Sequence, residues 1–209
     1  MNKFGFKKSL IEHLQEHNYN TKGFRREEIL SRITSSPPTK GMVRCAISEL
    51  MVLNALKEYG FVFFSKKDFS NSKYKAVEHQ QNLKFFDYLT PVVEFDFFGK
   101  HESDVYAIEV KAGKPKKNYN PQKALSFAKS LSNDMTTKLL IVAPFNSGLC
   151  INNYNASLNS NDIFAIDMNL SEDFFDTQLR AFYNQPPEKK HYEKTISHNN
   201  EVSNILKNI

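Results

Sequence analysis

Three charged side chains, Asp96, Glu109 and Lys111, occupy positions where two consecutive strands would bring them together. Residues two apart on a strand project from the same face, so Glu109 and Lys111 should point the same way while their neighbours face the other way. If the chain turns symmetrically about residues 102–103, Asp96 lies opposite Glu109, with Cβ atoms about 5 Å apart. The spacing therefore predicts two carboxylates and one ammonium at a single point of a sheet.

This combination indicates metal-ion chemistry. Two carboxylates directly opposite one another repel, so holding both at neutral pH calls for a cation between them. Carboxylate oxygens with open coordination positions suit Mg²⁺ or Mn²⁺. The compact ammonium of Lys111 could hold a water beside the ion or steady the charge of a phosphate.

Apolar residues at strand and helix spacings predict the elements that hold these side chains. Strands at residues 92–98 and 105–112 are close enough to form a hairpin, and a largely apolar helix at 43–59, ended by Gly60, comes before them. Further elements are expected at 61–64 (strand), 121–132 (helix), 139–143 and 163–168 (strands) and 172–183 (helix), whereas 76–90 is ambiguous. This order predicts an α/β fold with a mixed sheet.

The placement of the acid and of E-x-K on successive strands resembles the PD-(D/E)xK nuclease superfamily. The segments that carry the resemblance are EFD at residues 94–96 and IEVKAGK at residues 108–114, although the proline–aspartate pair of the family motif is absent and Val93, Glu94 and Phe95 precede the acid. In that superfamily a helix before the core often carries a glutamate, and Glu49 in the 43–59 helix matches that position. The resemblance covers about residues 43–168.

The resemblance implies a restriction-endonuclease-like core, with a central mixed β-sheet flanked by helices, and a set of site residues. Asp96, Glu109 and the backbone carbonyl of Val110 would bind Mg²⁺ or Mn²⁺, Lys111 would position the attacking water, and Glu49 would complete or orient the metal shell. A salt bridge in the core is an equally good interpretation of Glu49, because its neighbours one turn away are apolar.

The implied function is metal-dependent hydrolysis of DNA phosphodiester bonds. Relatives with segments of this appearance include Holliday junction resolvases, restriction endonucleases, and RecB- and Cas4-like nucleases. Two alternatives stay open: a structure-selective junction resolvase, which would act as a homodimer to cut two strands symmetrically, and a non-catalytic DNA-binding or assembly module on a nuclease-like fold. A winged-helix DNA reader, formed by the first three helices, is disfavoured because the third is too apolar to face a major groove.

Four lysines follow E-x-K and are candidates for phosphate contacts at the rim of the site: Lys114, Lys116, Lys117 and Lys123. An ordinary solvated loop explains them equally well. Glu94 shares a face with Asp96 and is the rival for the acid role, although a solvated strand residue is the simpler interpretation.

The composition of the chain excludes several classes of protein. The chain has 209 residues, of which 40% are hydrophobic, and its 18 Phe and 9 Tyr exclude a disordered tail. Its two cysteines, Cys45 and Cys150, are too few for a four-cysteine iron–sulfur site and are expected to be buried thiols. No apolar run of membrane-spanning length and no signal peptide is evident, so we expect a cytoplasmic protein without membrane association.

The net charge of +5 is concentrated at the N-terminus, where residues 1–44 hold nine Lys or Arg against four Glu. We expect residues 1–40 to form a basic extension with helices at 8–17 and 25–33, residues 41–185 to form the nuclease-like domain, and residues 186–209 to form a polar tail.

Overall fold

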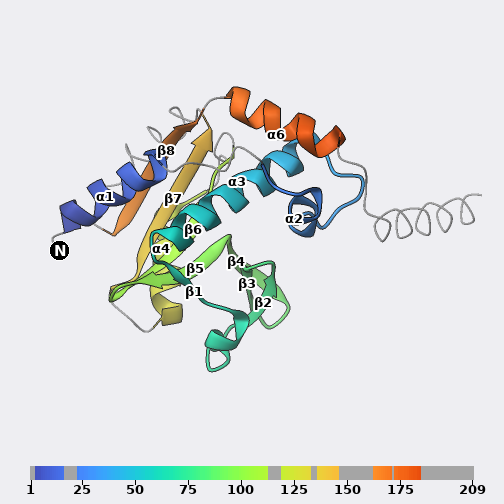
Figure 1. Cartoon of the computed structure of the whole chain (residues 1–209). Helices are drawn as coiled ribbons and strands as arrows, with labels where there is room; N and C mark the ends of the chain where they lie inside the picture. The colour runs from blue at the N-terminus through green and yellow to red at the C-terminus, as the bar shows by residue number, and fades with distance from the viewer. Residues whose placement is uncertain are drawn as a thin grey trace, which may run out of the picture.

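The computed structural model describes residues 3–16, 23–112, 119–132, 136–145, 162–170 and 172–184. It has an α/β architecture with a mixed five-stranded sheet, a second sheet of three strands, and helices on the faces of the larger sheet (Figure 1). The expected fold class is therefore confirmed at the level of a mixed sheet flanked by helices. The expected polar tail at 186–209 lies outside the described residues.

The five-stranded sheet has the order β1-β5-β6-β7-β8. Strands β1 (Val62–Phe63), β5 (Phe97–His101) and β6 (Asp104–Val110) pair antiparallel, whereas β6, β7 (Lys138–Phe145) and β8 (Ile163–Leu170) pair parallel. The apolar run from Leu139 to Ala143 is fully buried, as a strand covered on both faces requires.

Helices cover the two faces of this sheet unequally. On one face, α1 (Lys3–Glu16), α3 (Lys40–Glu58) and α6 (Glu172–Asn184) share a core with Ile108, Leu140 and Ile166. On the other face, α4 (Pro121–Ser132) packs on Ala107 and Ile141. Figure 1 shows α3 lying across the strands of the larger sheet. Helix α3 buries most of its apolar residues there, which agrees with the expectation that it is too apolar to read a groove.

Helix α3 begins three residues before the expected start because Thr39 caps it. The Thr39 hydroxyl accepts a hydrogen bond from the backbone N–H of Met42 at 3.3 Å. The helix ends at Glu58, and Gly60 follows with φ +98°, a left-handed conformation that favours glycine. Both ends of the helix that carries Glu49 are thus fixed by local chemistry.

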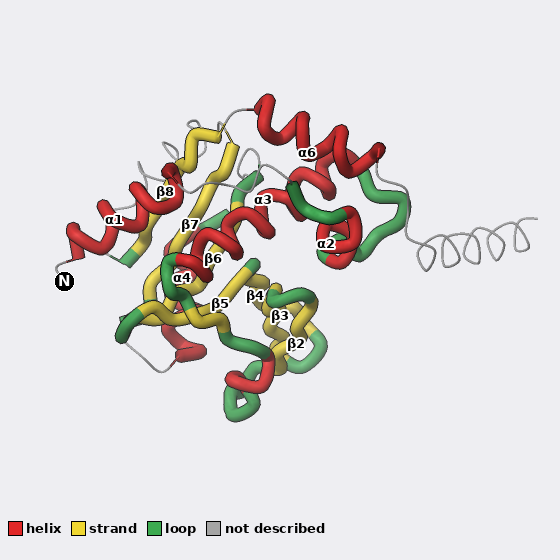
Figure 2. Tube along the Cα trace, in the orientation of Figure 1, coloured by secondary structure: helices red, strands yellow, loops and turns green. Residues whose placement is uncertain are grey.

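The expected strand at 92–98 is wrong as a single element, because the chain changes sheets within it. Strands β2 (Lys75–His79), β3 (Asn82–Asp87) and β4 (Thr90–Phe95) form the three-stranded antiparallel sheet, and β5 begins at Phe97 in the larger sheet. Figure 2 shows the two sets of strands separately. The ambiguous segment 76–90, which matched neither the helix nor the strand period, contains most of the β2–β3 hairpin. In the loop before this hairpin the structure has one 3₁₀ turn, η1 (Lys66–Phe69).

The basic N-terminal segment contributes to the main core. Helices α1 and α2 (Arg26–Ser31) bury Leu10, Leu14 and Ile29 in the same apolar cluster as α3 and the sheet. Helix α1 begins five residues earlier than expected.

Two further observations bear on the sequence predictions. None of the helices in the described ranges is both long and apolar enough to span a membrane. Cys45 is exposed and has no disulfide, so the prediction of a buried thiol at this position is wrong. Cys150 lies outside the described residues.

Candidate active site

The β5–β6 hairpin has the register that a symmetric turn about residues 102–103 predicts. Phe97 pairs with Ile108 and His101 with Asp104, so the next position along each strand puts Asp96 opposite Glu109. The turn is tight, and Glu102 adopts φ +54° in it. The backbone N–H of Val110 donates a hydrogen bond of 2.6 Å to Oδ2 of Asp96, which ties the acid to the strand that carries E-x-K.

Asp96 lies at the point where the chain passes from one sheet to the other. The preceding residue, Phe95, pairs with Leu83 in the three-stranded sheet, and the following residue, Phe97, pairs with Ile108 in the larger sheet. Because Phe95 and Phe97 are both buried, the backbone on each side of Asp96 is fixed by packing. The side chain of Asp96 is therefore held where the two sheets diverge.

Glu109 and Lys111 point the same way, as their spacing on a strand predicts, and they form an ion pair. Glu109 is only 6% exposed. The Lys111 ammonium also lies 4.5 Å from the centre of the Tyr119 ring, just before α4. The E-x-K segment thus presents a buried carboxylate with its own cation beside it.

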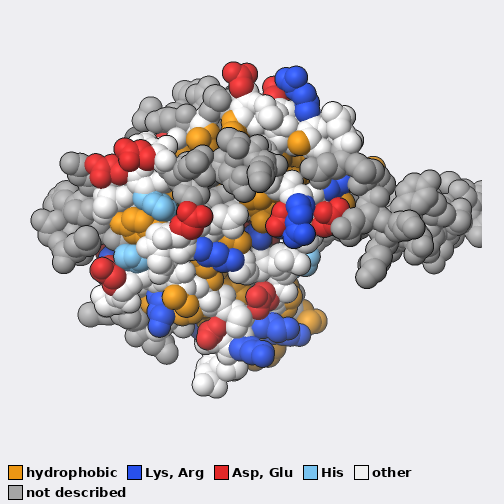
Figure 3. Space-filling model, viewed as in Figure 1, with side chains coloured by type: hydrophobic (Ala, Val, Ile, Leu, Met, Phe, Trp, Pro, Cys, Tyr) orange, Lys and Arg blue, Asp and Glu red, His pale blue; other side chains and the backbone are white. Residues whose placement is uncertain are grey.

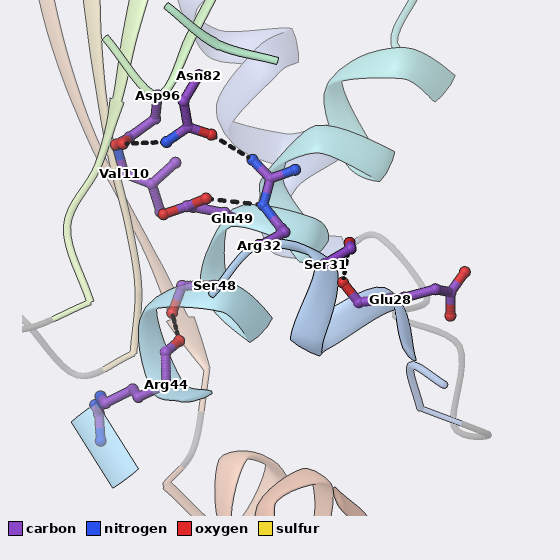
Figure 4. Close-up of polar contacts among 9 residues, drawn as sticks. All are labelled: Glu28, Ser31, Arg32, Arg44, Ser48, Glu49, Asn82, Asp96 and Val110. Carbon is purple, nitrogen blue, oxygen red and sulfur yellow. Dashed lines mark hydrogen bonds and ion pairs between the residues drawn. The ribbon is translucent and has the colours of Figure 1, made fainter. Parts of the chain in front are cut away.

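Glu49 reaches the same region from α3 through an arginine that sequence reasoning did not single out. Nε of Arg32 donates to Glu49 at 2.8 Å, and another guanidinium nitrogen of Arg32 donates to the Asn82 side-chain oxygen at 3.0 Å. The Asn82 amide is 3.5 Å from Oδ1 of Asp96. Figure 4 shows these side chains as a continuous series of polar contacts that ends at the backbone of Val110.

Two of these residues were missed for identifiable reasons. Arg32 was counted only as part of the basic charge of the N-terminal segment, and Asn82 lies in the ambiguous segment 76–90. The sequence does contain one signal for Arg32, because a glutamate on a mostly apolar helix needs a partner. Nothing local shows which arginine provides it.

The charge of Asp96 adds to the effect of burial on the pKa of both glutamates. Burial, reinforced by the charge of Asp96, raises the pKa of Glu109 to about 7 against the pull of Lys111. The same two causes raise the pKa of Glu49 to about 7 despite Arg32. Burial also raises the pKa of Asp96, while Lys111 and the Val110 N–H oppose that rise. Asp96, between β4 and β5, is thus close enough to Glu49 on α3 and to Glu109 on β6 to affect the ionisation of both glutamates.

The donor set suits a hard divalent cation, but the carboxylates are engaged by protein groups. Within the described residues, no three His, Cys, Asp or Glu side chains are gathered as a ready-made metal site. Asp96 accepts from Val110, Glu109 pairs with Lys111, and Glu49 pairs with Arg32. Asp96 and Glu109 are the oxygen ligands that fit Mg²⁺ or Mn²⁺ best, and an ion there would have to exchange with these contacts.

The remaining candidates divide into described and undescribed residues. Lys123 is exposed in the first turn of α4, which follows Tyr119. Lys114, Lys116 and Lys117 lie outside the described residues. Glu94, the rival acid, is half-exposed and pairs with Lys84 across the β3–β4 ladder at 3.5 Å.

Comparison of the chain with models of protein families, with curated proteins and with solved structures finds no match. Its function must therefore be inferred from its own side chains and their contacts.

Proposed function

We propose that this protein is a metal-dependent deoxyribonuclease with a restriction-endonuclease-like core. The observation that carries the proposal is the contact between Asp96 and the backbone of Val110, which brings that acid beside the Glu109–Lys111 pair. An acid on one strand next to an acid and a lysine on the neighbouring strand is the arrangement expected of an Asp…Glu-x-Lys site.

The order of elements supports the proposed core. Helix α3, with its glutamate, precedes the β5–β6 hairpin, and β6 continues through α4 into the parallel strand β7. These are the elements that the resemblance to PD-(D/E)xK nucleases leads us to expect around E-x-K. The site lies at one end of β6, where Lys111 follows the strand directly.

Each side chain has a role that its contacts favour. Asp96 and Glu109, with the carbonyl of Val110, would hold Mg²⁺ or Mn²⁺. When bound, the ion lowers the pKa of a water and offsets the charge of the scissile phosphate. Lys111 donates to the attacking water, and Tyr119 limits where the ammonium can move because it lies against the ring. Glu49 orients the site from α3.

The raised pKa values favour replacement of a carboxyl proton by a metal ion. A glutamate whose pKa is about 7 is partly protonated at neutral pH, and a cation that prefers the ionised form displaces that proton. Activity should therefore increase with pH through neutrality.

A non-catalytic DNA-binding module is the second candidate, and one observation favours it. The guanidinium of Arg32, only 3% exposed, already provides Glu49 with a cation. A site whose acids are satisfied by protein groups could keep its fold without holding a metal ion.

The two functions are separated by incubating supercoiled plasmid and linear DNA with the full chain in Mg²⁺, in Mn²⁺ and in EDTA. A nuclease degrades DNA with either ion and stops in EDTA, whereas a binding module shifts DNA in all three buffers without cutting it. Asp96→Asn should abolish cleavage, whereas Asp173→Asn, an exposed change of the same chemistry on α6, should not. Cleavage by Asp96→Asn at the wild-type rate would contradict the proposed site.

A further inference from the structure

The three-stranded sheet has one face in the core and one face open to solvent. Leu83, Phe85 and Phe95 are fully buried on the inner side. The alternate residues project the other way, and Lys75 pairs with Phe86 while Val77 pairs with Lys84. We call Lys75, Val77, Lys84 and Phe86 the outer face.

The outer face combines positive charge with aromatic and apolar surface. The Lys84 ammonium lies 5.8 Å from the centre of the Phe86 ring, and Val77 is 43% exposed. The Lys84–Glu94 pair is about half-exposed on both sides, so a phosphate could replace Glu94 at little cost. Figure 3 shows Lys or Arg and hydrophobic side chains side by side over this sheet.

The β3–β4 turn carries two large side chains that pack against almost nothing in the described structure. Tyr88 is 91% exposed and Leu89 is 93% exposed. Tyr88 also adopts φ +53°, a conformation uncommon for a bulky residue. With so few contacts, the two side chains contribute little to the stability of the fold and are accessible to a binding partner.

The same hairpin begins and ends at the candidate active site. Asn82, the first residue of β3, contacts Asp96, and Phe95, the last residue of β4, immediately precedes Asp96. Tyr88 follows Asn82 by six residue steps, which is about 20 Å of extended strand. The outer face therefore leads from the candidate active site to the tip over about 20 Å.

We propose that the outer face and the tip bind the single-stranded segment of nucleic acid that flanks the cleaved bond, with Tyr88 stacking on an unpaired base. Unpaired bases expose the faces that aromatic side chains stack on, and the lysines contact the phosphates between them. The inference rests on the proposed nuclease function, because it names the substrate that the site would cut.

The test measures binding and cleavage separately. Fluorescence anisotropy of the full chain in EDTA reports binding to a labelled single strand of about 20 nucleotides and to its duplex. Tyr88→Ala should weaken single-strand binding by about tenfold, since one lost base stack has that magnitude. Tyr88→Phe keeps the ring and should bind like the wild type. Tyr183→Ala removes a 53% exposed tyrosine on α6 and serves as the control.

Each outcome has a defined meaning. A loss confined to Tyr88→Ala supports the inference. Equal affinity of Tyr88→Ala and wild type, or tighter binding to duplex than to single strand, overturns it. Single-strand binding that depends on Tyr88, without cleavage in Mg²⁺ or Mn²⁺, would support binding at the outer face and contradict the proposed nuclease function. Absence of single-strand binding, with cleavage retained in Mg²⁺ or Mn²⁺, would overturn the inference and leave the proposed function in place.

Discussion

In the absence of divalent ions, lowering the pH from about 8 to about 5 should stabilise this protein, and Glu109 should account for much of the effect. Burial and the Asp96 charge raise the pKa of Glu109 to about 7 in the fold, whereas an unperturbed glutamate has 4.5. The folded chain therefore binds this proton more tightly than the unfolded chain does. The cost of ionising Glu109 is absent below pH 4.5 and complete above about 7.

The magnitude follows from the two pKa values. The difference between about 7 and 4.5, at about 1.4 kcal/mol per pKa unit, gives about 3 kcal/mol for Glu109. Glu49 has a similar shift. Because both glutamates respond to the same Asp96 charge, their contributions should not simply add. The direction is opposite to ordinary acid denaturation, in which carboxylates stabilised in the fold become protonated.

Urea unfolding followed by circular dichroism, at several pH values between about 5 and 8 in EDTA, measures this slope. Glu109→Gln removes the titrating group. It should reduce the increase in the free energy of unfolding on acidification by about 3 kcal/mol. Glu102→Gln, an exposed change on the same hairpin, is the matched control and should keep the wild-type slope. Other acids, such as Asp68 with its lowered pKa, contribute equally to the pH dependence of stability in all three proteins. Their contributions therefore cancel when the three slopes are compared. Parallel slopes for wild type and Glu109→Gln would refute the reasoning.

Two further perturbations test the packing around the site. Arg32→Leu leaves Glu49 without its buried cation and should lower the free energy of unfolding in urea by about 3–5 kcal/mol at pH 8, and Arg32→Leu combined with Glu49→Leu should recover most of that loss. Equal stability of the single and double variants would contradict a buried ion pair. Gly99→Ala places a Cβ 2.7 Å from the Val62 carbonyl oxygen and should cost about 1–3 kcal/mol in a thermal melt. Gly41→Ala, whose nearest atom is 3.9 Å away, should not destabilise, and a similar loss in both glycine variants would argue against the clash.

The hairpin that carries E-x-K was predictable because its determinants are local. Alternation fixes the faces of Glu109 and Lys111, and a short turn fixes the register that places Asp96 opposite Glu109. The helix that carries Glu49 was predictable for the same reason, since one residue caps it and a glycine follows its end.

The change of sheet at Asp96 could not be predicted in this way. Residues 92–98 are apolar enough to form one continuous strand, and their division depends on Phe95 pairing with Leu83, twelve residues earlier, while Phe97 pairs with Ile108, eleven residues later. The competition between these partners is decided by tertiary packing, which no local pattern reports.

The same nonlocality explains why the N-terminal segment, counted as a basic extension, is part of the candidate site. Arg32 joins Glu49 on α3 to Asn82 on β3, and Asn82 contacts Asp96, so three distant parts of the chain meet through one guanidinium. The Cζ atom of Arg32 also lies 5.2 Å from the centre of the buried Phe97 ring, and this contact restricts the position of the guanidinium. Because Leu10, Leu14 and Ile29 belong to the main core, this segment cannot leave without uncovering α3. The charge that balances Glu49 is therefore anchored by the same apolar packing that holds the sheet.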